Sequence, residues 1–91
     1  MLELKKTKQF KKDLKLAIKR GLPIELLDEV IKILREEKPL PLKNFDHNLI
    51  GNYKGFRECH IQPDWLLIYA IDAKNLILTA TRTGTHSDLK L

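Results

Sequence analysis

The sequence predicts an α+β domain in which an N-terminal helical hairpin packs on one face of a small antiparallel β-sheet, with a short turn or helix at the C-terminus. Two observations lead to this prediction. Apolar residues recur at the helical period over residues 7–38 and at the strand period over residues 56–83. No repeat, low-complexity tract or Gly/Ser linker divides the chain, so we expect a single domain over residues 1–91.

The two helices are predicted from their caps and apolar faces. The first opens at Thr7, whose hydroxyl suits an N-cap, and stops at Gly21. Its buried face should comprise Phe10, Leu14, Ala17 and Ile18. The second helix begins near Pro23 and ends at about Lys38, because the residue before a proline disfavours helical geometry. Its buried face should comprise Ile24, Leu27, Val30, Ile31 and Leu34. The segment "LEL" at 2–4 is compatible with a short strand before the hairpin.

Three strands follow in the second half of the chain. "FRECHI" at 56–61 alternates, which places Glu58 and His60 on one face and Arg57, Cys59 and Ile61 on the other. "WLLIYAI" at 65–71 is almost wholly apolar, as expected of a central strand with both faces covered. "LILTATRT" at 76–83 alternates again after the turn "DAKN". The helices should cover the face that carries Cys59.

Composition limits the class of protein. The single cysteine, Cys59, excludes an internal disulfide and a cysteine-rich zinc cluster, and is typical of a reducing compartment. No apolar run is long enough for a signal peptide or a membrane span. We therefore expect a cytoplasmic protein with no membrane partner.

The positive charge is concentrated at one end. Residues 1–20 hold eight basic and two acidic residues, so this end carries the whole excess of the +5 net charge. Four lysines share one face of the first helix: Lys8, Lys12, Lys15 and Lys19. The stripe is either a binding surface for a polyanion, such as nucleic acid or an acidic protein, or a solvated face that keeps the protein soluble.

The residues suited to chemistry are three histidines in the second half, His47, His60 and His86. Histidine both gives and takes a proton near neutral pH. Asp64 is placed to orient an imidazole, and Arg82 to hold an anion. Cleavage of RNA by its own 2′-hydroxyl needs this set of a base, an acid and a cation, and it requires no metal.

Each of these residues also has a structural interpretation. His47 could be an ordinary loop residue, His60 a cross-strand packing partner and His86 part of a C-terminal cap. Trp65 and Tyr69 share a strand face and are more often core than base-stacking residues. A three-histidine zinc site ranks below the metal-free site, because the spacings of 13 and 26 residues include no short ligand pair.

Three motifs, "DHNLIG", "GFRECHIQPDWLLIY" and "TRTGTHSDL", stand in an order and spacing that resembles the YafQ branch of the RelE-like toxins (RelE/ParE superfamily) of bacterial type II toxin–antitoxin systems. The resemblance extends over essentially the whole chain. It implies a RelE-like fold and an endoribonuclease, an mRNA interferase, that cuts mRNA on the ribosome without metal or cofactor and leaves 2′,3′-cyclic phosphate ends. It also implies a cognate antitoxin that neutralises the toxin, with operator DNA contacted only through that complex.

The resemblance assigns roles position by position. Four residues match the active site of the family: His47, His60, Asp64 and His86. His47 and His86 are the leading candidates for acid and base, and His60 and Asp64 would orient them and the substrate. Trp65 would lie beside them, and Arg82 would contact the phosphate. The lysine stripe would then contact rRNA phosphates or an acidic segment of the antitoxin.

Two departures from the family pattern bear on activity. Asn48 stands where a proline is frequent, which predicts a looser loop, and Lys90 stands where many members have phenylalanine. The alternative hypothesis is therefore a toxin-fold protein with weak or no nuclease activity that acts as an antitoxin-binding co-repressor. A third is a basic nucleic-acid-binding module whose histidines are incidental.

Overall fold

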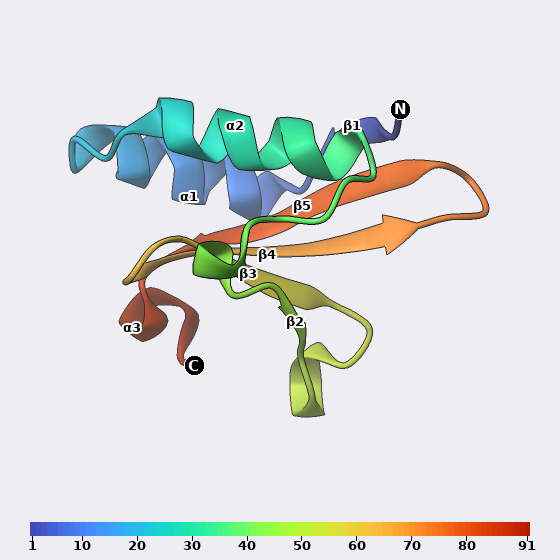
Figure 1. The fold of residues 1–91 in the computed structure, drawn as a ribbon. Coiled ribbons are helices and arrows are strands. Elements are labelled where there is room, and N and C mark those ends of the chain that lie inside the picture. Colours follow the sequence, from blue (N-terminus) through green and yellow to red (C-terminus); the bar gives the residue numbers. More distant parts are fainter.

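Two helices cover one face of a five-stranded sheet in the computed structural model, which describes residues 1–91 (Figure 1). The sheet has the strand order β1-β5-β4-β3-β2. In chain order, the helices, strands and 3₁₀ turns are β1 (Glu3–Lys6), α1 (Lys8–Lys19), α2 (Ile24–Arg35), η1 (Leu42–Asn44), β2 (His47–Asn48), η2 (Gly51–Tyr53), β3 (Arg57–Gln62), β4 (Trp65–Asp72), β5 (Ile77–Gly84) and α3 (His86–Leu89). No helix is long and apolar enough to cross a bilayer.

The helical hairpin forms largely where the sequence predicts it. Thr7 caps α1 by accepting a hydrogen bond from the Phe10 amide, and Gly21 takes the positive φ that ends the helix. Two details of the prediction are wrong. Ile18 is 57% exposed rather than buried, and α2 ends at Arg35 instead of about Lys38.

The order of elements and the sheet type differ from the prediction. A strand precedes the hairpin, so the hairpin is not the first element, and the sheet is mixed rather than antiparallel. β1 pairs in parallel with β5, Glu3 opposite Ile77, while the remaining pairs are antiparallel. Without β1, β5 would be an open edge of the sheet. β1 covers that edge, and Leu2, the residue before β1, is completely buried.

The core explains which face of the sheet is free for a site. Side chains alternate along β4, so that Trp65, Leu67 and Tyr69 pack under the helices and Leu66 and Ile68 face the other side. The helix-facing layer is the larger, and Cys59 lies in it, as predicted. On the opposite face lie α3 and the turn η2, which pack against this smaller layer through Leu89 and Tyr53 (Figure 1). That face is therefore open near the ends of β3 and β4.

Candidate active site

Three histidines converge on the open face of the sheet around one carboxylate. β3 carries Glu58 and His60, and β2 places His47 directly opposite Glu58. The Nε2 atoms of His47 and His60 lie 3.5 Å and 3.6 Å from Glu58 Oε1. The His86 ring, at the start of α3, lies edge-on to His60 with 5.5 Å between ring centroids. The sequence-predicted histidines thus come together in space.

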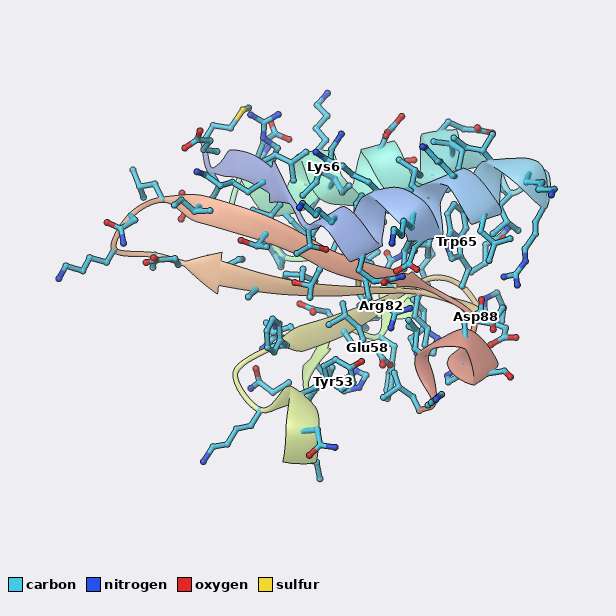
Figure 2. All side chains as sticks on the ribbon, turned by 180° about the vertical axis from the view of Figure 1, so that it is seen from behind. Lys6, Tyr53, Glu58, Trp65, Arg82 and Asp88 are labelled. Atoms are coloured by element: carbon cyan, nitrogen blue, oxygen red, sulfur yellow. The ribbon has the colours of Figure 1, made fainter.

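Glu58 is the site residue that the sequence analysis missed. It is only 5% exposed, and Figure 2 shows it on the side of the sheet away from the helices. A buried carboxylate needs compensation, and two imidazoles supply it when they are protonated. The signal was present in the alternation of β3, which placed Glu58 and His60 on one face. The sequence did not show that the His47 loop pairs with β3 and brings His47 opposite Glu58.

His86 and Asp64 form a carboxylate–imidazole pair, as predicted for an orienting aspartate. Asp64 Oδ1 accepts from the His86 backbone amide at 2.9 Å and from Nδ1 at 2.6 Å. These two bonds, the backbone bond first, hold the pKa of Asp64 below its ordinary value. Because a carboxylate only accepts, the proton lies on Nδ1, and the Nε2 of His86 is left for chemistry.

The short helix α3, which carries His86, is fixed by a capping box and by an ion pair. Thr85 and Asp88 form a capping box, each side chain accepting from the backbone amide of the other. Asp88 also pairs with Arg20, the residue that follows α1, at 2.6 Å. The Arg20 side chain, followed by the Thr85 amide, lowers the pKa of Asp88 strongly. Gly84 makes room for this arrangement, since a Cβ there would lie 2.9 Å from Asp88 Cβ.

The His47 loop is held by an ionic clamp from the strands. Arg57 binds Asp46 at 3.1 Å, and Tyr69 donates its hydroxyl to the same carboxylate. Arg57 Nη1 also donates to Asn48 Oδ1 at 2.7 Å, which links Asn48 to β3, and the looser loop expected from the absence of proline stays a prediction. His47 Nδ1 lies 2.8 Å from the Phe45 carbonyl, which can only accept, so Nδ1 carries a proton.

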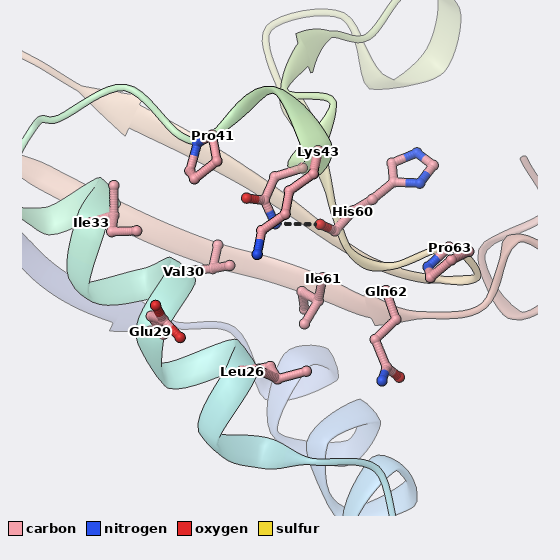
Figure 3. A pocket seen from close by; sticks show the side chains of 11 residues that line it. Leu26, Glu29, Val30, Ile33, Pro41, Lys43, His60, Ile61, Gln62 and Pro63 are labelled. Atoms are coloured by element: carbon pink, nitrogen blue, oxygen red, sulfur yellow. Dashed lines mark hydrogen bonds between the residues drawn. The ribbon is translucent and has the colours of Figure 1, made fainter.

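His60 is positioned through its backbone. Asn44, itself buried, donates from its side-chain amide to the His60 carbonyl at 2.8 Å. Figure 3 shows this bond beside a cavity of about 330 Å³ that α2 lines through Leu26 and Val30, and shows the imidazole pointing away from it. The cavity is therefore behind the site and not part of it.

Two residues predicted to contact substrate are engaged elsewhere. Trp65 is 1% exposed, lies on the helical side of the sheet and donates to Thr83 at 2.9 Å, so the predicted substrate contact is wrong (Figure 2). Its place in β4 makes it core, because odd positions of that strand face the helices. Arg82 pairs with Asp13 of α1 through Nε at 2.9 Å, which raises its pKa.

The lysine stripe is exposed along α1, with Lys8, Lys12, Lys15 and Lys19 all on the solvent side. None of these four takes part in an ion pair. The stripe therefore keeps its charge available for a partner.

Comparison with known proteins decides the family. Residues 2–91 match the model of a family described as the bacterial toxin of type II toxin–antitoxin system, YafQ. The chain is a member of the YafQ toxin family. The YafQ-like identification made from the motifs is thereby confirmed.

Named relatives agree over nearly the full length. The mRNA interferase toxin YafQ of Escherichia coli strain K12 is 43% identical over 82 residues, which cover 89% of this chain and 87% of that protein. A crystal structure of a metal-bound toxin from Helicobacter pylori has a TM-score of 0.93 and 45% identity, with 98% of this chain and 99% of that chain covered. YafQ in the E. coli DinJ–YafQ toxin–antitoxin complex has a TM-score of 0.88 and 38% identity, with 98% of each chain covered.

The site of this YafQ-family member also contains a set of metal-ligand types. Glu58, His60 and His86 each offer one ligand atom, and these atoms lie within 4.8 Å of one another. Imidazole and carboxylate donors suit zinc and copper. The set differs from the three-histidine site weighed from the sequence, since Glu58 takes the place of His47.

Proposed function

We propose that this YafQ-family toxin is an endoribonuclease that cuts translated mRNA on the ribosome by acid–base catalysis with its own side chains. The observation that carries the proposal is the convergence of three imidazoles and two carboxylates on the one open face of the sheet. This is the inventory for attack of a 2′-hydroxyl on the adjacent phosphate.

His86 is proposed as the general base. Its Nδ1 proton is held by Asp64, so Nε2 is free to take the proton of the 2′-hydroxyl. The carboxylate fixes the ring orientation and stabilises the imidazolium that forms, as the aspartate does in a Ser-His-Asp triad. Asp64 is then a positioning residue, because it acts through His86.

His47 is proposed as the general acid that protonates the departing 5′-oxygen. Its Nδ1 lies 2.8 Å from the Phe45 carbonyl and carries a proton, and its Nε2 lies 3.5 Å from Glu58 Oε1. When the ring is protonated, it forms an ion pair with Glu58, which orients the Nε2 proton that the reaction would use. His60 shares the same carboxylate oxygen and lies between the other two rings, where it orients the substrate.

Arg82 and the lysine stripe are proposed to supply positive charge. The N–H groups of Arg82 that Asp13 does not use can face the phosphorane. Lys8, Lys12, Lys15 and Lys19 suit contacts with rRNA phosphates, which need no sequence specificity.

We also propose a cognate antitoxin as the partner that neutralises the toxin. The E. coli relative is bound to DinJ in a toxin–antitoxin complex. Operator DNA would be contacted only through such a complex. A toxin that acts on translated mRNA would work in the cytoplasm. An acidic antitoxin segment would complement the basic surface of α1.

The test is cleavage of an mRNA programmed on 70S ribosomes, read by primer extension, with chelator present. Wild-type protein should give defined cuts that need the ribosome and survive the chelator, and His86→Ala should give none. Ser87→Ala, on the exposed side of α3, is the matched control and should cut like wild type. Cuts that persist when His47 and His86 are both replaced by alanine would contradict the proposal and favour an incidental role for the histidines.

The second candidate function is that of an antitoxin-binding co-repressor with little nuclease activity. The observation in its favour is the exposed Lys90 at the end of α3, where many family members carry phenylalanine. Expression without antitoxin separates the two functions, because an active interferase stops growth and a pure binding protein does not.

A further inference from the structure

One aromatic side chain is exposed, and it lies against the histidines of the site. The chain has six aromatic residues, and Phe45 alone is exposed, with 64% of its surface accessible. Its ring centroid lies 5.0 Å from that of His47 and 5.6 Å from that of His60. A single exposed apolar residue is common on protein surfaces, so exposure alone does not distinguish Phe45. What distinguishes it is the contact of its ring with two imidazoles of the site.

The backbone of Phe45 is held in an unfavourable conformation. Its φ of 45° lies in the left-handed region, which phenylalanine rarely adopts and asparagine or glycine adopts readily. The conformation ends the turn η1 and aims the Phe45 carbonyl at His47 Nδ1. Conformations of this kind are concentrated at functional sites, where the surrounding structure sustains them. The carbonyl bond alone needs no aromatic side chain, because any residue supplies a carbonyl.

We propose that the Phe45 ring is the platform on which a nucleobase beside the scissile phosphate stacks. This rests on the proposed ribonuclease function. The other aromatic residue expected near the substrate, Trp65, is buried, and position 90 is a lysine. Phe45 is the remaining ring that is both exposed and in contact with two site imidazoles. Stacking accepts any base, so Phe45 sets position and not base identity.

The test compares three variants on the same fold. Phe45→Trp keeps a ring, and Phe45→Asn removes the ring while suiting the left-handed backbone. Leu42→Ala, at an apolar residue of η1 that is 98% exposed, is the control. Single-turnover cleavage is measured on programmed ribosomes. Stacking is measured separately by the fluorescence of 2-aminopurine placed beside a 2′-O-methyl-blocked cut site.

The stacking proposal predicts that Phe45→Asn loses about 5- to 150-fold in cleavage rate and no longer quenches 2-aminopurine, as the removal of one stacked base implies. Phe45→Trp and Leu42→Ala should stay within about threefold of wild type. Equal cleavage and quenching by Phe45→Asn and wild type would overturn the proposal. So would a Phe45→Asn protein that cleaves normally but binds antitoxin weakly, which would assign the ring to the antitoxin.

The two measurements also separate this proposal from the function on which it rests. If wild type makes no cuts, the ribonuclease proposal fails, yet quenching on the blocked mRNA still decides the role of the ring. Quenching by wild type and not by Phe45→Asn supports stacking, and absence of quenching by wild type overturns it.

Discussion

Glu58→Gln removes the charge at the centre of the site and keeps the shape of the side chain. Glu58 Oε1 lies 3.5 Å from His47 Nε2. At that separation two unit charges interact by about 1 kcal/mol in water and about 5 kcal/mol at an effective dielectric constant of about 20. The His47 side chain is 37% exposed, so solvent screens the pair and the lower end applies, about 1–2 kcal/mol.

This energy translates directly into a change in the cleavage rate. Since about 1.4 kcal/mol is a tenfold change in rate, Glu58→Gln should lower the single-turnover rate about 5- to 30-fold. The neutral amide no longer attracts the positive charge that the two neighbouring imidazoles carry when they are protonated. The assay is single-turnover cleavage at one pH, with a melting curve of each variant to show that it is folded. Glu25→Gln, exposed on α2, is the matched control. A Glu58→Gln rate equal to that of wild type would refute the reasoning.

Three further predictions concern stability. Gly84→Ala should lower the free energy of unfolding by about 1–3 kcal/mol in urea titration, because the new Cβ would lie 2.9 Å from Asp88 Cβ, and Ser87→Ala should not. The pKa values of Asp64 and Asp88 are held below the ordinary 3.8. The stability that these two carboxylates give to α3 is therefore complete above that pH and is lost as the pH falls through the lowered pKa values. Amide hydrogen exchange should show that α3 opens in acid before the sheet does, and loss of protection in α3 and the sheet at the same pH would contradict this. Burial raises the pKa of Cys59 to about 12, so a thiol reagent should modify it only in denaturant, and modification of the folded protein would show that the core opens there.

The sequence predicts the elements that depend on local pattern. The caps at Thr7 and Gly21 and the alternation along β3 and β4 are local signals, and the structure places those elements within a few residues of the prediction. The parallel pairing of β1 with β5 joins residues more than 70 positions apart, and no local pattern encodes it. The exposure of Ile18 has the same origin, since the width of the covered helix face is set by the sheet beneath.

The candidate site shows the same division. Residue types and motifs indicate the three histidines and Asp64, because their chemistry is intrinsic to them. The role of Glu58 depends on a two-residue strand, β2, that brings His47 opposite it, and so short a strand has no periodicity to detect. Trp65 is kept from contact with substrate because the helices occupy its face of β4. The exposure of Phe45 depends on the conformation of the loop after η1.

The measurement that tests the central claim most directly is the chemistry of the ends produced on ribosome-bound mRNA in the presence of chelator. Attack by the 2′-hydroxyl, driven by His86 and His47, predicts 2′,3′-cyclic phosphate on the upstream fragment and a 5′-hydroxyl on the downstream one, with neither formed by His86→Ala. A 3′-hydroxyl with a 5′-phosphate, or cuts that vanish with chelator and return with a divalent metal, would contradict an acid–base site made of the protein's own side chains.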